Sequence, residues 1–208
     1  MVRSQILSVL RGEVPFVVFP SLIRSSSSSS SVVPFLFPGS FNPLHAGHKQ
    51  LAEAAQQSVG LASTVTFEIS VHITDKGPVS PDDIEARVAQ FRQTPYAVAL
   101  TRAPLMIDKA VLFPGFHFIM GVDTLTRMLN PTYYEGKSVE GLRKNLQKFK
   151  ETKVKFVVGG RLDKTTGQWV DPAKVEVLDG FQDLFVTIPE HSFRVDLSST
   201  EIRAGLKT

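Results

Sequence analysis

Apolar residues recur with strand spacing and with helix spacing in alternation from residue 33 onward. Short apolar runs of strand length lie at 33–37, 64–71, 96–100, 116–120 and 155–158. Segments with helical periodicity and helix-end residues lie between them, at 46–58, 81–93 and 139–150. This alternation predicts crossover connections and a parallel sheet that helices cover on both faces. We therefore expect one Rossmann-like, doubly wound α/β domain over residues 32–208.

The first 31 residues follow a different pattern. Ser25 to Ser31 form an unbroken serine run, and such a tract cannot bury enough apolar surface to offset its ordering entropy. The residues before it contain three arginines and a single acid. We expect residues 1–31 to be a disordered extension or a transit-like segment that directs the chain to a plastid or mitochondrion. Without such targeting, the expected location is the cytoplasm.

Composition excludes several classes of function. The formal net charge is +3 and no long Lys/Arg run occurs, so nucleic-acid binding is not indicated. The chain has no cysteine, which excludes disulfides, zinc thiolate sites and thiol nucleophiles. No apolar run approaches the ~20 residues needed to span a bilayer, so no membrane partner is expected.

A first candidate site lies between the first predicted strand and the first predicted helix. The segment reads Gly39-Ser40-Phe41-Asn42-Pro43, followed by His45-Ala46-Gly47-His48. Gly39 lets the backbone approach a ligand without a Cβ in the way, and the helix start offers N–H groups to phosphate. His45 and His48 are three residues apart, so both can donate to the same phosphate oxygens. Capping and surface roles are the alternatives; metal binding is less favoured, because no carboxylate has the companion spacing.

A second candidate site lies near the C-terminus. Ser198 and Glu201 have the spacing of a capping box, which predicts a helix start. Ser199, Thr200 and Arg203 add hydroxyls and a guanidinium to the free N–H groups of that start. Two such helix starts in one chain could hold a polyphosphate from two sides.

The two segments together resemble the signatures of the HxGH nucleotidylyltransferases. Residues 39–48 resemble the HxGH signature, and residues 198–203 resemble the SSTxIR signature, in the order of that family. Gly121-Val122-Asp123 resembles the GxD element of nicotinamide and nicotinate mononucleotide adenylyltransferases. Lys76-Gly77 followed by Arg87 resembles the loop and helix of the same branch.

The resemblance implies an enzyme that transfers AMP from ATP to a pyridine mononucleotide and releases pyrophosphate, as in NAD biosynthesis. It implies catalytic roles for His45, His48, Lys76 and Arg203. It implies nucleotide-binding roles for Gly39, Ser40, Phe41, Gly121, Asp123, Ser199 and Thr200. The expected cofactor is Mg²⁺, held mainly by substrate phosphates because it keeps much of its hydration.

Other functions stay open at this point. A cytidylyltransferase, or an adenylyltransferase with another phosphorylated acceptor, would share both signatures; a nucleotide-binding regulator without turnover is an alternative of another class. Residues 102–110 contain no aromatic side chain to stack on a pyridine. Trp169 is either a stacking residue or a packing residue of a hairpin, and Asp123 either binds ribose or pairs with Arg127 along a helix. The oligomeric state is open.

Overall fold

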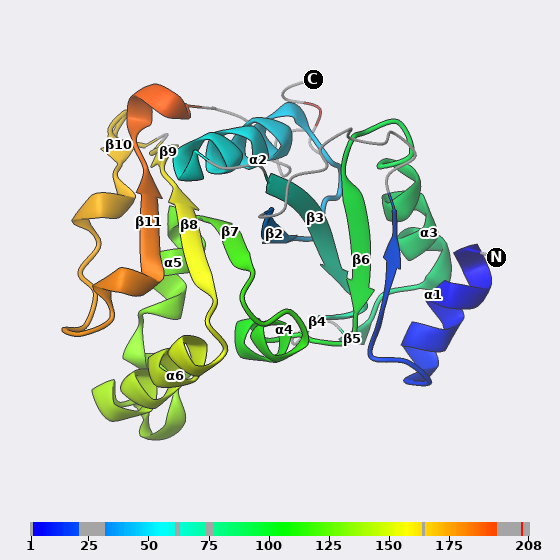
Figure 1. Ribbon diagram of the computed structural model, residues 1–208, viewed down its shortest axis with the longest axis horizontal. Coiled ribbons are helices and arrows are strands. Elements are labelled where there is room, and N and C mark those ends of the chain that lie inside the picture. The colour runs from blue at the N-terminus through cyan, green and yellow to red at the C-terminus, as the bar shows by residue number, and fades with distance from the viewer. Residues whose placement is uncertain are drawn as a thin grey trace.

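Seven strands form the central sheet of the structure, a computed structural model that describes residues 2–20, 32–60, 63–73, 77–163, 165–194 and 205 (Figure 1). In spatial order they are β1 (Phe16–Phe19), β6 (Ala97–Thr101), β3 (Ser63–Ser70), β2 (Val33–Pro38), β7 (His117–Gly121), β8 (Lys155–Gly159) and β11 (Phe185–Ile188). All neighbours pair in parallel except β1, which runs antiparallel to β6 at one edge.

The strand order shows a doubly wound sheet. From β2 the chain adds β3 and then β6 on one side, and it returns to add β7, β8 and β11 on the other side. This is the predicted Rossmann-like fold, which the structure confirms. The direction of winding reverses between β2 and β7, and in open α/β sheets ligands bind beyond the carboxyl ends of the strands at such a reversal.

Both faces of the sheet are buried, which explains why its strands read as continuous apolar runs. Along β2, Phe35 and Phe37 enter one core cluster and Leu36 enters the other, with exposures of 0%, 6% and 0%. Helices α1 (Val2–Arg11), α2 (Ala46–Val59) and α3 (Pro81–Ala89) contribute to the first cluster. Helices α4 (Met106–Leu112), α5 (Val122–Met128) and α6 (Val139–Glu151) contribute to the second.

The predicted helices α2, α3 and α6 are present, although α3 ends at Ala89 rather than at residue 93. Helices α4 and α5, each of about two turns, and the last strand β11 were not predicted from the sequence. Two short two-stranded ribbons lie outside the central sheet: β4 (His72–Ile73) pairs with β5 (Gly77–Pro78), and β9 (Arg161–Leu162) pairs with β10 (Trp169–Val170). Short 3₁₀ turns lie at 131–133, 135–137, 172–174, 182–184 and 190–192.

The expectation that residues 1–31 are a disordered extension is wrong for residues 2–20. Helix α1 lies beside α3 (Figure 1), and β1 extends the sheet at the edge of β6. Ile6 and Val9 are completely buried in the core cluster. Their spacing, with Leu10, gives α1 an apolar stripe that favours docking, and β1 covers an otherwise open strand edge. Ser25 to Ser31 lie outside the described residues, and targeting stays a prediction.

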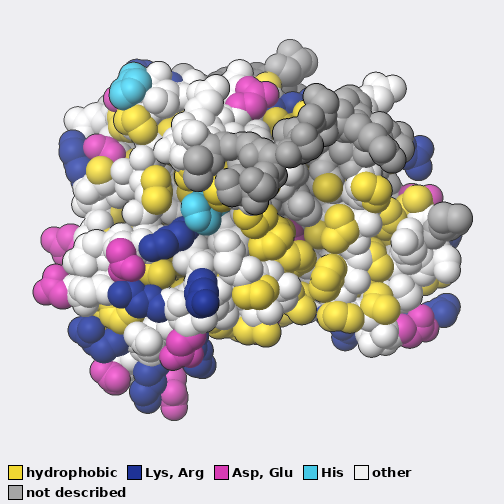
Figure 2. Space-filling model, viewed as in Figure 1, with side chains coloured by type: hydrophobic (Ala, Val, Ile, Leu, Met, Phe, Trp, Pro, Cys, Tyr) yellow, Lys and Arg dark blue, Asp and Glu magenta, His cyan; other side chains and the backbone are white. Residues whose placement is uncertain are grey.

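Charged side chains gather over α6. Figure 2 shows Lys and Arg side chains, interspersed with acids, in the part of the view where Figure 1 places this helix, while apolar side chains gather over the opposite half. The inner face of α6 is buried through Leu142, Leu146 and Phe149, as its predicted amphipathic pattern requires. Within the described ranges, no helix combines the length and the apolar character needed to cross a membrane.

Candidate active site

The first predicted motif forms the connection between β2 and α2, at the reversal point of the sheet. Gln90, in the turn after α3, holds this loop from the side. Its Nε2 donates to the carbonyl of Phe41 at 3.0 Å, and its Oε1 accepts from the backbone N–H of Leu44 at 2.8 Å. A side chain distant in sequence therefore fixes the backbone of the loop.

Phe41 anchors the loop in the core, and its ring leaves no space for a side chain at residue 39. The Phe41 ring is 1% exposed and packs edge-on against Phe37 and Phe67, with centroid distances of 5.5 and 4.9 Å. A Cβ on Gly39 would lie 2.6 Å from this ring, closer than packed carbon atoms approach. An internal contact thus requires glycine at this position, and the predicted approach of a ligand to Gly39 stays a prediction. Only the backbone of Phe41 remains for the predicted nucleotide contact.

The two motif histidines lie together at the start of α2. Their rings stack with centroids 3.7 Å apart, and the backbone N–H of His45 donates to Nδ1 of His48 at 3.3 Å. Because Nδ1 of His48 accepts this bond, the proton of the neutral ring resides on Nε2.

Burial keeps both rings uncharged. It lowers the pKa of His48 to about 3, with a smaller contribution from His45, and it lowers the pKa of His45. An imidazole in a low-dielectric position loses its charged form first. At neutral pH, therefore, His48 can act as a neutral hydrogen-bond donor through Nε2, with its orientation already set.

Gly121 and Asp123 lie at the same edge of the sheet as the first motif, because β7 is the parallel neighbour of β2. Asp123 is in the first turn of α5, and its Oδ2 accepts from Nε of Arg161 at 2.6 Å. The structure thus pairs Asp123 with Arg161 rather than with Arg127. The hydrogen bond to Asp123 also raises the pKa of Arg161. The side chain of Asp123 is 62% exposed and that of Arg161 is 44% exposed, so both groups remain accessible to a ligand.

Four predicted site residues lie outside the described residues: Lys76, Ser199, Thr200 and Arg203. The same holds for Ser198 and Glu201. In the sequence, Lys76 falls between β4 and β5. The roles that the resemblance implies for these side chains stay predictions.

A cavity of about 270 Å³ opens beside the first motif, and it contains two residues that the sequence analysis missed. Its lining comprises Pro38, Gly39, Ser40, Glu68, Ser70, His72, Arg87, Pro104 and Lys109. Glu68 on β3 and Lys109 on α4 form a buried ion pair, with Nζ 2.9 Å from Oε1 and side-chain exposures of 1% and 7%. Burial raises the pKa of Glu68, while Lys109 and the hydroxyl of Thr101 act in the opposite direction.

A signal for this pair was present in the sequence. Glu68 interrupts the apolar run of its predicted strand, and an acid in a strand buried on both faces requires a partner. The partner was not identifiable from the sequence, because Lys109 lies 41 residues away on a helix that was not predicted.

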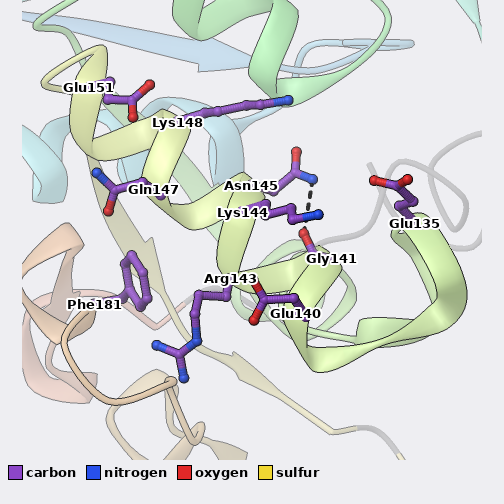
Figure 3. A pocket seen from close by; sticks show the side chains of 10 residues that line it. All are labelled: Glu135, Glu140, Gly141, Arg143, Lys144, Asn145, Gln147, Lys148, Glu151 and Phe181. Atoms are coloured by element: carbon purple, nitrogen blue, oxygen red, sulfur yellow. Dashed lines mark hydrogen bonds between the residues drawn. The ribbon is translucent and has the colours of Figure 1, made fainter.

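A larger cavity, of about 580 Å³, lies on the outer face of α6 and contains no predicted site residue. Figure 3 shows that most of its side chains project from α6, with Glu135 and Phe181 at its borders. The one hydrogen bond drawn there joins Asn145 to the carbonyl of Gly141 within the helix, at 3.2 Å. Arg143 lies over the Phe181 ring at 5.8 Å. This groove consists of a solvated helix face and does not converge on the sheet edge.

Trp169 is a packing residue of the β9–β10 hairpin. Its ring lies against Gly160, where a Cβ would overlap it. Of the two predicted roles, the structure therefore supports the hairpin role. Within the part of the chain that the structure describes, no three His, Asp or Glu side chains form a group able to hold a metal ion.

Comparison with protein families gives one match over most of the chain. Residues 36–205 match the model of the cytidylyltransferase-like family, a span that includes both predicted signatures. No curated protein was found to match the sequence.

Proposed function

This chain belongs to the cytidylyltransferase-like family, and we propose that it transfers AMP from ATP to a pyridine mononucleotide with release of pyrophosphate. Family membership supports a nucleotidyltransferase activity in general. The choice of ATP and of a pyridine acceptor rests on the resemblance of Gly121-Val122-Asp123 and of the Lys76 region to the adenylyltransferase branch. One observation carries the proposal of catalysis: the stacked, uncharged His45–His48 pair at the start of α2.

The chemistry requires positioning and charge neutralisation more than acid–base catalysis. The phosphate of the acceptor is already anionic, so it attacks the α-phosphate of the donor without a general base, and pyrophosphate leaves in line. The Nε2–H of His48 and the N–H groups at the start of α2 are suited to the charge that develops on the transferred phosphate. Ser199, Thr200, Arg203 and Lys76 are proposed to hold the departing pyrophosphate.

Mg²⁺ fits this proposal as an ion carried by the substrates. The two acids described near the site already have basic partners, Glu68 with Lys109 and Asp123 with Arg161. Substrate phosphates and water would therefore supply most of its ligands, and the ion would supply further neutralisation of phosphate charge.

Transfer of CMP, or of AMP to another phosphorylated acceptor, is the second candidate, because residues 102–110 supply no stacking ring. A regulator without turnover is disfavoured by the intact His45, His48 and Arg203. The test is pyrophosphate release with ATP or CTP, Mg²⁺ and one of four acceptors: nicotinamide mononucleotide, nicotinate mononucleotide, phosphopantetheine or phosphocholine. Release with ATP and a pyridine mononucleotide would support the proposal. Release with CTP alone, or with another acceptor alone, would contradict it.

The role of His48 can be separated from its role in capping α2. Asn places an acceptor where Nδ1 of His48 accepts from His45, but it has no donor at the position of Nε2. We expect His48→Asn to keep the melting temperature and the nucleotide affinity and to lower kcat by about 10²–10³-fold, the cost of a lost transition-state donor. His48→Gln, which restores a distal donor, should recover part of the rate. The exposed His191 supplies the control variant His191→Ala; unchanged kcat in His48→Asn would refute the assignment.

A further inference from the structure

The cavity beside the first motif is lined by two chemically different groups of residues. One group comprises Gly39, Ser40 and Arg87, whose guanidinium donates to the carbonyl of Ser40 at 3.3 Å. The N–H of Gly39 already donates to the carbonyl of Glu68, so Arg87 supplies the positive charge that suits a phosphate. The other group comprises Glu68 and Lys109, which form a buried ion pair.

The two oxygens of Glu68 are in unequal environments. Oε1 accepts twice, from the Thr101 hydroxyl at 2.5 Å and from Nζ of Lys109 at 2.9 Å. Oε2 is buried and has no hydrogen-bond partner among the described residues. The residue as a whole is 1% exposed.

A purely structural role accounts for only half of this arrangement. The bonds at Oε1 join β3, β6 and α4, and this cross-link explains the presence of Lys109 and Thr101. It does not explain Oε2, because a buried acceptor without a donor is costly and rare in folded proteins. Because Glu68 is one of the residues that line the cavity, a ligand bound there could supply the donor that Oε2 lacks.

We propose that Glu68 selects the acceptor, by accepting a hydrogen bond from an uncharged N–H or O–H group at the end of the acceptor that lies away from its phosphate. Resting on the proposed function, this inference names the carboxamide form of the pyridine mononucleotide, rather than the carboxylate form, as the preferred acceptor. A carboxamide presents two N–H donors, whereas a carboxylate presents none and would leave Oε2 of Glu68 without a donor.

Lys109 does not offset this preference. Its ammonium group already donates to Oε1 of Glu68 and to the carbonyl of Ala103. Its charge is matched by that of Glu68, so the pair as a whole is neutral. An acceptor carboxylate would therefore meet no unpaired cation in this pair.

The test uses a matched pair of acceptors that differ only in this group. The affinities of nicotinamide mononucleotide and nicotinate mononucleotide for the full chain would be measured by titration calorimetry, and turnover of each with ATP would be followed in parallel. We expect at least about tenfold tighter binding of the amide, the effect of one unpaired buried polar group.

Glu68→Gln sharpens the test, because it keeps an acceptor for Lys109 and Thr101 and replaces Oε2 with an NH₂ donor. The preference should then shrink or invert in favour of the acid. Arg87→Gln is the control: it should weaken both acceptors by the same factor and leave their ratio unchanged. Melting temperatures would show that each variant is folded. If Glu68→Gln does not fold, the ratio of the two acceptor affinities in the wild-type chain is the test of the proposal.

The outcomes separate this inference from the proposed function. Turnover of both acceptors with equal affinity, a preference for the acid, or a ratio unchanged in Glu68→Gln would overturn the role of Glu68 and leave adenylyl transfer intact. Failure of both acceptors with ATP would overturn the proposed function, and the inference that rests on it would fall as well.

Discussion

Replacing Lys109 with methionine should strongly destabilise the fold, because it leaves the charge of Glu68 buried and unpaired. Both side chains are at least nine-tenths buried, so solvent cannot take over the role of the ammonium. Removing one partner of such a pair costs about 3–5 kcal/mol. For a domain of this size, that loss corresponds to a fall of about 6–20 °C in melting temperature.

The destabilisation should depend on pH in a defined direction. Burial already raises the pKa of Glu68 above its ordinary value of 4.5, and loss of Lys109 removes the main opposing contribution. A carboxyl group with a raised folded-state pKa stabilises the fold fully below its unfolded pKa, and this stabilisation is lost as the pH rises through the folded pKa. The stability gap between Lys109→Met and the wild type should therefore be smallest near pH 4.5 and widen toward neutral pH.

Urea denaturation followed by circular dichroism, at several pH values, would measure these differences. The double variant Glu68→Gln/Lys109→Met supplies the matched control, since a neutral amide can still accept from Thr101 and carries no charge. It should recover most of the stability lost in Lys109→Met, which is non-additive behaviour expected of contacting residues. A loss below about 1 kcal/mol in Lys109→Met, typical of an exposed pair, would refute the reasoning. Additive losses in the double variant would do the same.

Three further substitutions test other parts of the structure. Ile6→Ala removes a fully buried side chain of α1 and should cost about 2–5 kcal/mol in urea denaturation. Gly39→Ala forces a Cβ against the Phe41 ring and should lower both the melting temperature and kcat, with an overpacking cost of about 1–3 kcal/mol. Asp123→Asn breaks an exposed pair with Arg161, so stability should change by less than about 1 kcal/mol. If Asp123 also binds ribose, the same variant should raise KM for ATP severalfold.

Each of these three substitutions has a control variant or an outcome that would contradict the expected effect. For Ile6→Ala the control is Leu105→Ala, since Leu105 is 51% exposed; equal stabilities of the two variants would mean that α1 is dispensable. Native kcat and melting temperature in Gly39→Ala would show that the Phe41 ring moves freely. An unchanged KM for ATP in Asp123→Asn would remove the ribose assignment and leave only the ion pair with Arg161.

The sequence by itself determined the class of fold and the position of the first motif. Apolar runs alternating with helical segments predicted a parallel sheet, because strands buried on both faces must be apolar throughout, and the structure confirms it. The motif around His45 and His48 was identifiable since its residues are close in the chain. Local spacing sufficed to place both rings at the start of one helix, with His45 as its N-cap residue and His48 in its first turn.

Tertiary structure alone decided which distant residues meet. The serine run suggested an extension, yet residues 2–20 complete the sheet, because the edge of β6 and the apolar stripe of α1 become partners only after folding. The Phe41 ring excludes a Cβ at Gly39, and this contact depends on the left-handed backbone of Phe41, at φ +44°.

The ion pairs show most clearly which contacts local spacing predicts and which depend on the tertiary structure. Spacing along one helix favoured Arg127 as the partner of Asp123, but the carboxyl ends of β7 and β8 lie side by side and bring Arg161 closer. Glu68 and Lys109 meet for a similar reason, through the adjacency of β3, β6 and α4. Periodicity encodes which face of an element is buried; it does not encode which element lies opposite, since that depends on the order of strands in the folded sheet.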